Sequence, residues 1–530
     1  MFSDDERRAL APYFTNVDRP IFALTNLPET VKGALFARYS RSAKSLRRLF
    51  LDEFLDQVAE PPVASKVGEE RAARLYQRVF NDYGDDSVAQ LGGVHLAVED
   101  ASNVLTKVLE RGRLMAYLEQ STRYIPYTER RGESWRSLVP AELDGHSLRA
   151  EYVATLDAAF ETYARWIDPM RAWFERRYPK AEGDSDGVYR AAIRAKALDT
   201  LRGLLPAATQ SNVGIYGTGQ AYEALLLRMR AHPLAEVQTA ASAILDELRQ
   251  VIPAFLIRVD QPDRGGRWSA YLAEVRARTA EHARRIEADL ETGDADEVTL
   301  SDFDPDGEVK VIAAALYPGG SVGDTALLAA ARALPDEDRI AILSAAIGDR
   351  TNRRHKPGRA FERTSYRFDV LTDYGAFRDL QRHRLCTIDW QQLTTSHGYV
   401  QPEAIVEAGG GADFARVMSR SAELFERLTD AGFADAASYA VSMAYRIRFV
   451  MDMNAREAMH VIELRTAPQG HPAYRRVCQQ MHTLIADRAG HRAIAAAMQF
   501  ADHSNVELER LQEERRLESK RRAHEVSSTS

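Results

Sequence analysis

The stretch that decides the fold is ERGRLMAYLEQSTRY (110–124), which has a counterpart further along the chain in QRHRLCTIDWQQLTTSHGY (381–399). Both blocks contain Arg-x-Arg-Leu, and both follow a run that is typical of a buried strand or helix. A second pair of blocks follows in the same order, NVGIYGTGQAYEALLLRMR (212–230) and RIRFVMDMNAREAMHVIELRT (446–466), each typical of an apolar helix that ends in Leu-Arg. Such ordered self-similarity indicates an internal duplication, although the bare pattern leaves unrelated halves open. The longer first half predicts an insertion around residues 165–200.

Length and composition limit the class of protein. The chain has 530 residues, of which 45% are hydrophobic, and its formal net charge is −7. At about 150 residues per domain, this length predicts three to four domains or two large ones. The negative charge excludes a chain-wide basic surface for nucleic acid, although a local basic pocket stays open.

Metal, disulfide and membrane chemistry are not indicated. Cys386 and Cys478 cannot form a disulfide framework or a Cys-rich metal site, and His383 with His397 gives no metal-ligand spacing. No apolar run approaches the ~18–20 residues of a membrane span, and MFSDDERR (1–8) is not a signal peptide. We therefore expect a soluble cytoplasmic protein with no metal, no membrane and no nucleic acid among its partners.

Most segments have helical spacing. Amphipathic helices are predicted over 42–58, 149–179 (with a kink at Pro169) and 235–259. Strand signals are few: VKVIAAALYP (309–318) and the alternating YRFDVLTDYGAF (366–377). The pattern predicts an α+β fold that is dominated by helices.

An acidic stretch divides the chain near its middle. It begins with EADLETGDADEV (287–298) and clusters Gly, Pro and Asp, which is typical of a linker. The predicted organisation is an N-terminal domain (1–286), an acidic linker (287–308), a C-terminal domain (309–505) and a charged tail (506–530). We expect the tail to be a solvated helix that frays into disorder.

The repeated blocks resemble the flavin-dependent thymidylate synthases (ThyX). Their signature runs Arg-His-Arg, seven residues, Ser, and the first half has Arg111-Gly112-Arg113, seven residues, Ser121. The preceding YGDDSVAQLGGVHLAVE (83–99) is similar to the family's approach to that signature. The second half has an intact Arg382-His383-Arg384, and MNAREAMHVIELR (453–465) is similar to the family's helix with Asn-x-Arg and a terminal Arg. The resemblance covers roughly 60–260 and 305–485.

The resemblance implies an activity, cofactors and an assembly. Members of the family are α+β proteins that form homotetramers with active sites built between subunits. They convert deoxyuridylate (dUMP) to thymidylate, with methylenetetrahydrofolate as the carbon donor, FAD as the hydride carrier and NADPH as the reductant. Two tandem ThyX-like domains in one chain would form a pseudo-dimer, and a homodimer of such chains would mimic the tetramer.

The first half resembles a nucleotide pocket that has lost its flavin contacts. Gly112 stands where the signature has His, Asp85 where a flavin-side His is expected, and Gly217, Gly219 and Glu223 replace polar residues of the later helix. The family's nucleotide-side residues remain: Arg111, Arg113, Glu119, Ser121, Arg123, Arg202 and Arg228. Arg123 and Arg202 would grip the phosphate, and Arg228 would face charge that develops on a ring oxygen. Ser121 would bind the nucleotide, since its neighbourhood offers no base for a nucleophile.

The second half departs from the family in the opposite way. The signature's Ser, Glu and Arg are replaced by Gln392, Trp390 and Thr394. Ser438 lies near the position that corresponds to Arg202 of the first half. Its flavin-side residues remain: His355, Arg382, His383, Arg384, Asn454, Arg456 and His460, where His355 requires two extra residues in the alignment. Arg382, Arg384 and Arg456 would hold the diphosphate, and His383 would lie against the isoalloxazine.

Other interpretations stay open. Asn454 followed by Glu457 also fits a helix N-cap with a capping box, and His355 also fits a plain surface position. The division between halves predicts one flavin per chain. The alternatives to a thymidylate synthase are a flavoenzyme on another pyrimidine nucleotide or folate, and a non-catalytic protein that binds nucleotide or flavin.

Overall fold

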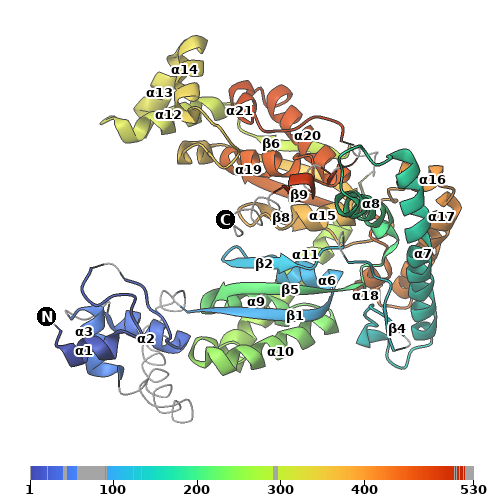
Figure 1. Ribbon diagram of the computed structural model, residues 1–530, viewed down its shortest axis with the longest axis horizontal. Helices are drawn as coiled ribbons and strands as arrows, with labels where there is room; N and C mark the ends of the chain where they lie inside the picture. Colours follow the sequence, from blue (N-terminus) through green and yellow to red (C-terminus); the bar gives the residue numbers. More distant parts are fainter. Residues whose placement is uncertain are drawn as a thin grey trace. The chain divides into compact units, whose positions relative to one another are not determined.

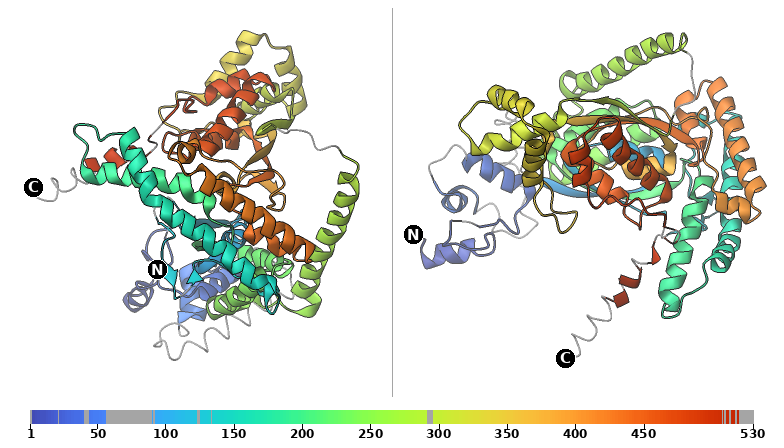
Figure 2. Two further views of the ribbon diagram at one scale, coloured as in Figure 1. Left: turned by 90° about the vertical axis from the view of Figure 1, so that its right-hand side faces the viewer. Right: turned by 90° about the horizontal axis from the view of Figure 1, so that it is seen from above.

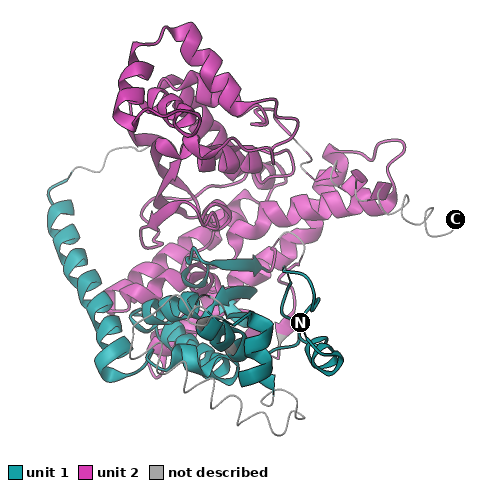
Figure 3. Cartoon of the chain, turned by 90° about the vertical axis from the view of Figure 1, so that its left-hand side faces the viewer, with its two compact units in different colours: residues 1–101, 108–119, 212–291 teal, residues 102–107, 120–211, 292–530 magenta. Residues whose placement is uncertain are grey.

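The computed structural model describes residues 2–20, 22–39, 44–55, 90, 92–122, 125–132, 134–290 and 296–506, and eight positions of the tail between 508 and 519. The chain packs into two compact units (Figure 3). Unit 1 comprises residues 1–101, 108–119 and 212–291, and unit 2 comprises 102–107, 120–211 and 292–530. Packing therefore divides the chain differently from the sequence repeat, whose halves are continuous segments.

Unit 1 is built around a three-stranded sheet with the order β1-β5-β2. Its elements are α1 (Asp4–Leu10), α2 (Glu29–Tyr39), α3 (Leu46–Glu53), β1 (Gly93–Ser102), β2 (Met115–Glu119), β5 (Gln210–Thr218), α9 (Gly219–Arg230), α10 (Ala235–Val251) and α11 (Arg267–Glu287), with the ends of β1 and β5 continuing into unit 2. Strands β2 and β5 are antiparallel, and α9 covers one face of the sheet (Figure 1). The buried Tyr222 of α9 donates its hydroxyl to the carbonyl of Val94 on β1, which fixes this helix on the sheet.

Unit 2 is built around a four-stranded antiparallel sheet with the order β6-β7-β9-β8. Its strands are β6 (Val298–Phe303), β7 (Ser365–Asp373), β8 (Thr387–Trp390) and β9 (Arg446–Asn454), and a separate ribbon pairs β3 (Arg130–Arg131) with β4 (Ser134–Trp135). Its helices are α7 (Leu148–Arg177), α8 (Asp186–Leu201), α12 (Gly307–Leu316), α13 (Asp324–Ala333), α14 (Asp336–Ile347), α15 (Tyr374–Leu380), α16 (Glu403–Glu407), α17 (Gly411–Asp430), α18 (Ala434–Ala437), α19 (Ala455–Arg465), α20 (Pro472–Asp487) and α21 (Arg492–Ala497). Buried residues alternate along β7 and β9, so one face of the sheet builds the core against the helices. The fold is therefore α+β and rich in helices, as predicted.

The two halves of the sequence repeat the same order of elements. The first has β1, α6 (Asn103–Leu109), β2 and, later, the 3-10 helix η4 (Arg202–Leu204), β5 and α9; the second has β7, α15, β8 and, later, η9 (Ser438–Ala440), β9 and α19. In both sheets, the third strand of this series pairs between the other two. Helices α9 and α19 are both capped by the last residue of the preceding strand, Thr218 and Asn454. This repetition is the structural counterpart of a tandem duplication.

Equivalent segments of the two halves pair with each other inside unit 2. Pro206 forms an antiparallel bridge with Ser442. Ala207 donates its N–H to Val441 and Met443 donates to Leu205, while Ala208 donates to Tyr439 and Ala444 donates to Gly203. Each bond thus has a mate with the roles of the halves exchanged. Such reciprocity is the mark of a two-fold contact, here formed within one chain.

The long helix predicted over 149–179 is confirmed as α7, and Pro169 lies inside it. It runs antiparallel beside α17, because Glu151 pairs with Arg427 near one end and Arg165 pairs with Asp413 near the other (Figure 2). Helices α7 and α8 have 30 and 16 residues, whereas α17 and α18 have 20 and 4. The longer helices account for the greater length of the first half, near the predicted insertion.

Several expectations about secondary structure need correction. The strand predicted over 309–318 is wrong, because these residues form most of α12 with Val311, Ile312 and Ala313 buried. A short apolar run fits a buried helix as well as a strand, so periodicity could not decide. Within the predicted linker, residues 298–303 form β6, whose buried Val298 and Leu300 alternate with polar residues. The predicted strand over 366–377 is β7 only as far as Asp373, where α15 begins.

Two predicted helices are shorter than expected. Helix α10 ends at Val251 and a 3-10 turn follows, and α3 covers Leu46–Glu53 of the helix predicted over 42–58, whose last residues lie outside the described part. Most of the charged tail also lies outside it. Among the helices that the structure describes, none is both long and apolar enough to cross a bilayer.

Candidate functional site

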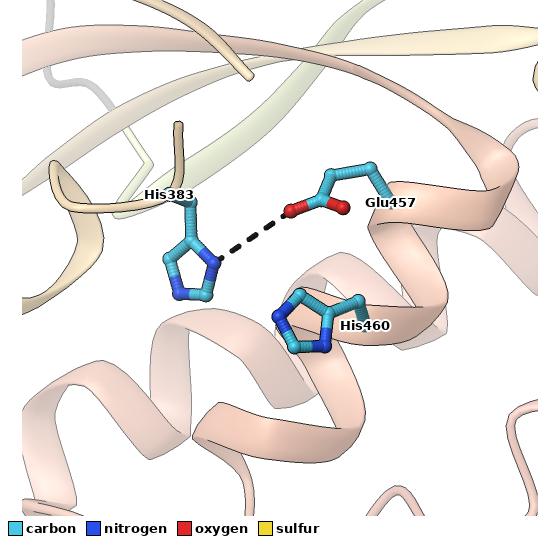
Figure 4. A group of neighbouring side chains, drawn as sticks. All are labelled: His383, Glu457 and His460. Atoms are coloured by element: carbon cyan, nitrogen blue, oxygen red, sulfur yellow. Dashed lines mark ion pairs between the residues drawn. The ribbon is translucent and has the colours of Figure 1, made fainter. Parts of the chain in front are cut away.

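Two histidines and a glutamate of the second half meet at the start of α19. His383 lies in the loop between α15 and β8, and Glu457 and His460 lie one turn apart on α19 (Figure 4). His383 Nδ1 is 3.8 Å from Glu457 Oε1, and the two imidazole rings are 5.7 Å apart between centroids at 72°. His383 and Glu457 are only 6% and 5% exposed. The signature histidine and the later helix are therefore brought together, as the resemblance implied.

The local sequence explains why α19 presents these side chains. Asn454 ends β9 and its side-chain oxygen accepts the N–H of Glu457 at 2.9 Å, which starts the helix. Residues three apart then share a face, so Glu457 and His460 point the same way. The N-cap interpretation of Asn454 is thereby confirmed, whereas the Glu457 carboxylate of the expected capping box faces His383. The role of Asn454 in flavin binding stays a prediction.

Arg465 at the end of α19 sets the state of His383. Its Nε donates to His383 Nε2 at 2.8 Å, so Nε2 must be the unprotonated nitrogen of a neutral ring. Nδ1 then carries the proton and faces Glu457. Arg465 also donates through Nη2 to the backbone carbonyl of Asp379 at 2.5 Å.

Burial shifts all three titratable groups toward their neutral forms. Burial holds the pKa of His383 well below its usual range, and the charge of Arg465 adds to this. Burial, with Lys356 and Arg353 nearby, lowers the pKa of His460 to about 4. Burial raises the pKa of Glu457 to about 7, although Lys356, Arg456 and Arg384 oppose it. The histidines are thus neutral at pH 7, and the carboxyl group titrates close to that pH.

The cluster has the dimensions of a metal site, but its surroundings favour an anion. One ligand atom from each of the three residues lies within 4.8 Å of the others. The basic side chains that act on them are Arg353, Lys356, Arg382, Arg384, Arg456 and Arg465. A metal cation would be repelled by this field, and Nδ1 of His383 presents a proton rather than a lone pair. Sequence analysis expected no metal and did not foresee that Glu457 joins the two histidines.

The remaining flavin-side candidates lie on the rim of this basic region. Arg456 donates through Nε to the carbonyl of Pro357 at 2.9 Å. His355 is exposed, and its ring nitrogens lie 3.3 Å from Thr351 Oγ1 and 3.0 Å from Asn352 Nδ2. Arg384 is exposed. His355 is therefore held by its own loop, which fits the surface interpretation.

Asp379 connects this cluster to Arg202. Its Oδ1 accepts from Arg382 Nη2 at 2.5 Å and lies 3.8 Å from Arg465 Nη1. Its other oxygen, Oδ2, lies 3.8 Å from Arg202 Nη1. All four residues belong to unit 2. One carboxylate thus faces arginines from both the predicted nucleotide side and the predicted flavin side.

Arg202 lines a cavity of about 430 Å³ in unit 2. The charged residues of its wall are Lys196, Asp199, Arg202, Asp373, Glu403 and Arg476. The Arg202 side chain is 6% exposed, with Asp199 at 4.0 Å and Asp373 at 3.9 Å, and its Nη2 makes no hydrogen bond to any described residue. Burial raises the pKa of Asp373, while Arg202 opposes this. The guanidinium is therefore surrounded by carboxylates at distances too long for good hydrogen bonds.

In unit 1, Arg111 and Arg228 form a second basic site. Burial lowers the pKa of Arg228, and the nearby charge of Arg111 adds to this. Nη2 of Arg228 is buried and has no hydrogen-bond partner among the described residues. A buried guanidinium next to a like charge is stabilised by an anionic or carbonyl ligand.

The other nucleotide-side candidates are dispersed. Arg113 is exposed, and Glu119 is buried at the end of β2 opposite Val213 of β5. Ser121 follows β2 and belongs to unit 2, and Arg123 lies outside the described residues, as does Asp85. The structure therefore brings Arg111 and Arg228 together. A common pocket that also includes the remaining residues stays a prediction.

Tyr117 occupies the place where the first half lacks the signature histidine. A Cβ atom added to Gly112 would lie only 2.7 Å from the Tyr117 hydroxyl oxygen, which donates to the Gly112 carbonyl at 3.0 Å. In the first half, the space that a side chain at position 112 would need is thus filled by the Tyr117 hydroxyl.

The helix caps correct the alignment of the later helices by one residue. Thr218 and Asn454 are both N-caps, so Gln220 corresponds to Arg456 and Ala224 to His460. The expected counterparts Gly217, Gly219 and Glu223 are therefore each wrong by one residue. Glu223 instead pairs with Arg258 at 2.5 Å in a mostly buried ion pair. The first half still lacks the flavin-side chains in the corrected alignment.

Sequence reasoning missed Glu457, Arg465 and Asp379 as site residues. Glu457 and His460 are three apart on a predicted helix, which could have indicated a shared face. Arg465 was noticed only as the terminal Arg of the repeated block. Asp379 carried no signal beyond lying three residues before Arg382.

Comparison with known proteins shows the family. The model of the family described as thymidylate synthase complementing protein matches residues 34–254 and 300–489. A UPF0159 protein of Chlamydia muridarum is 38% identical over 97% of this chain and 98% of its own length, and one of Thermoplasma acidophilum is 30% identical over 91% and 97%. A flavin-dependent thymidylate synthase of Mycobacterium sp. (strain KMS) is 29% identical over 34% of this chain and 67% of its own length.

These matches agree with the geometry. The family model matches once in each half, and each half carries the same series of strands and helices. The full-length relatives share the whole doubled length, whereas the flavin-dependent synthase spans about a third of the chain. The chain therefore belongs to the thymidylate synthase complementing protein family (ThyX), as a tandem duplication with two diverged halves.

Proposed function

We propose that this protein is a flavin-dependent, thymidylate synthase-like enzyme that converts dUMP to thymidylate. In this proposal, methylenetetrahydrofolate supplies the carbon, NADPH supplies the reducing equivalents, and the reaction takes place in the cytoplasm. The observation that carries the proposal is the pair of neutral histidines, His383 and His460, inside a field of arginines and lysine. A neutral aromatic surface beside a strong positive field suits a flavin, which has a polar ring and an anionic diphosphate.

The second half would hold FAD. Arg382, Arg384 and Arg456 would bind its diphosphate, and His355 and Asn454 are the further candidates from the family pattern. His383 would lie against the isoalloxazine, with its ring held by the bond from Arg465 to Nε2 and its Nδ1 proton facing Glu457. FAD supplies the hydride chemistry when bound, and the protein supplies the position and the electrostatic field.

The first half would bind the nucleotide. Arg228, whose buried Nη2 has no partner among the described residues, would stabilise negative charge that develops on the uracil ring. Arg111, Arg113, Glu119, Ser121 and Arg123 would surround the nucleotide, and Arg202 would contact its phosphate from a cavity of about 430 Å³. Ser121 would act through its hydroxyl as a binding group.

The proposal predicts a definite stoichiometry. Only the second half has the signature histidine, and Tyr117 fills the corresponding space in the first. Titrating FAD against the purified chain should therefore give one flavin per chain and two per homodimer. Complementation of a thymidine auxotroph tests the reaction itself. Two flavins per chain would disprove the division between halves, and absence of flavin binding would disprove the enzyme.

A second candidate substrate is favoured by the carboxylates around Arg202. Asp199, Asp373 and Asp379 lie within 4.0 Å of its guanidinium nitrogens and would weaken its hold on a dianionic phosphate. This surrounding fits the alternative of a flavoenzyme that acts on folate, whereas another pyrimidine nucleotide, the second alternative, would carry the same phosphate and gains no support from it. Flavin binding with no complementation, and with no measurable binding of dUMP, would favour this candidate.

A further inference from the structure

We infer that Glu457 is a positioning residue that links occupation of the flavin site to a proton, because its carboxyl group has to be neutral for the anionic cofactor to bind tightly. The inference rests on the proposed function, in which FAD binds the second half. It adds a role for a residue to which the family resemblance gave none.

The position of Glu457 carries the inference. Its side chain is only 6% exposed and points toward the two histidine rings (Figure 4). Oε1 lies 3.8 Å from His383 Nδ1, which is too far for a good hydrogen bond. The hydrogen bond that Glu457 makes in the described part of the chain runs from its backbone N–H to Asn454. A buried carboxyl group without a donor is costly to ionise.

Positive side chains surround Glu457 without pairing with it. Arg456 instead donates through Nε to the carbonyl of Pro357 at 2.9 Å, and its Nη1 lies 3.5 Å from Glu362 of the 3-10 helix η8 (Arg359–Arg363). Burial outweighs the positive field and raises the pKa of Glu457 to about 7. The cations that oppose this shift are Lys356, Arg384 and Arg456. The region therefore gains a negative charge as pH rises through neutrality.

Other titratable groups near α19 do not take this role. Burial lowers the pKa of both His383 and His460, so these rings are already neutral at pH 7. Burial also lowers the pKa of Lys356, and that lysine is kept in the variant described below. The charged and titratable groups on the neighbouring elements face other partners: Tyr474 and Arg475 of α20 lie against Arg465 and Thr466, and Arg367 of β7 pairs with Asp452 of β9.

The first half lacks the whole cluster. Gly112 corresponds to His383 in the signature, and the aligned helix caps place Ala221 at Glu457 and Ala224 at His460. The carboxyl group is thus present only in the half that keeps the flavin-side residues. This distribution fits a role in the flavin site.

Charge repulsion supplies the link to a proton. An ionised Glu457 repels the diphosphate and competes with it for the field of Arg384 and Arg456. At an effective dielectric constant of about 20, two unit charges about 10 Å apart change an equilibrium constant about tenfold or more. Since linkage is reciprocal, FAD raises the pKa of Glu457, and binding above pH 7 takes up a proton.

The test measures the Kd of FAD for the full chain between pH 6 and pH 8.5. For wild type we expect the Kd to rise about tenfold over this range. Calorimetry at pH 7.5 in buffers of different ionisation enthalpy should show an uptake of about half a proton or more per FAD. In Glu457→Gln the Kd should match wild type at pH 6 and change less than about twofold up to pH 8.5, because the amide is neutral throughout. The matched control is Glu362→Gln, which removes another carboxylate near Arg456 and should keep the wild-type pH dependence.

The outcomes separate this inference from the proposed function. If FAD binds wild type with a Kd that does not change with pH and without proton uptake, the inference is wrong and the proposed function stands. The same holds if folded Glu457→Gln keeps the wild-type pH dependence, because Lys356 or a histidine then causes it. If wild type does not bind FAD at any pH, both are wrong. Proton uptake by wild type decides against the inference, when it is absent, even if Glu457→Gln does not fold.

Discussion

The two Arg-x-Arg loops of this chain have the same origin and opposite surroundings. In the first, Gly112 lies under the Tyr117 hydroxyl, and in the second, His383 is held between Arg465 and Glu457. In unit 1, Nη2 of Arg228, which lies near Arg111, is buried and has no hydrogen-bond partner among the described residues. The same backbone element thus carries two different sets of side chains, which is what the proposed division of ligands between the halves requires.

The largest effect is expected from Arg382→Ala. A charge-assisted hydrogen bond to a phosphate contributes about 1.5–3 kcal/mol, so the affinity for FAD should fall tenfold or more. Flavin absorbance during titration measures this, and the affinity for dUMP should not fall. The corresponding variant Arg111→Ala should lower the affinity for dUMP and leave the affinity for FAD unchanged. Equal effects of both variants on both ligands would contradict the division between the two loops.

Restoring the histidine in the first loop should not restore a flavin site. In Gly112→His the new Cβ would lie 2.7 Å from the Tyr117 hydroxyl, and overpacking of this kind costs about 1–3 kcal/mol. Urea unfolding should show this loss, and FAD should still bind once per chain. Adding Tyr117→Phe removes the clashing hydroxyl and should recover most of the stability. A second flavin in Gly112→His alone would show that the filled space is no barrier.

Glu457→Gln should change the pH dependence of stability. The pKa of Glu457 is about 7 in the folded protein and about 4.5 when unfolded, so between these values the folded state holds a proton that the unfolded chain has released. The free energy of unfolding of wild type therefore carries a contribution that falls as pH rises through this window. Glu457→Gln lacks this contribution. Its free energy of unfolding, relative to that of wild type, should therefore rise by about 1–2 kcal/mol between pH 5 and pH 8.

His383 and His460 act in the opposite sense, because their folded pKa values are lowered and protonation in the unfolded chain favours unfolding below about pH 6.5. They are present in both proteins, so comparing the variant with wild type removes most of their effect. The control is Glu426→Gln on the exposed side of α17, which should show no pH-dependent difference. A difference between Glu457→Gln and wild type that is constant with pH would contradict the burial of a titrating carboxyl group.

The smallest effect concerns the equivalent caps. Thr218→Ala and Asn454→Ala should each cost about 1 kcal/mol of unfolding free energy, because each removes an acceptor for the first turn of its helix. Asn454→Ser keeps an acceptor and should lose only a few tenths. If Asn454→Ser also keeps full affinity for FAD, then Asn454 is a cap alone; a tenfold loss would make it a flavin ligand as well.

The sequence predicted what is local and repeated. Ordered blocks indicated the duplication, and the helical spacing over 149–179 predicted α7. Short apolar runs did not specify a state, so α12 was expected as a strand. The alignment of α9 with α19 was wrong by one residue, because only the observed caps fix where each helix begins.

Contacts between distant residues could not be predicted from spacing. His383 and Arg465 are 82 positions apart, and they meet because α19 packs where the signature loop ends. Asp379 of α15 and Arg202 of η4 are also far apart in the sequence, yet Oδ2 and Nη1 lie 3.8 Å apart in unit 2. The family resemblance supplied the histidines and arginines, and it gave no sign of the carboxylates that surround them. The acidic residues that pair with the basic site could therefore be identified only from the three-dimensional structure.

The reciprocal pairing of residues 203–208 with 439–444 is made by backbone atoms, and small residues allow the close approach, because a Cβ atom added to Gly203 would lie 2.9 Å from the Cβ of Ala444. Outside these segments, substitutions in either half leave the backbone bonds that join the halves unchanged. In an assembly of identical subunits, every substitution appears at all equivalent positions at once, and a change that improves one site damages another. When the two copies are fused into one polypeptide, each can change without the other. The two unlike Arg-x-Arg loops require this independence.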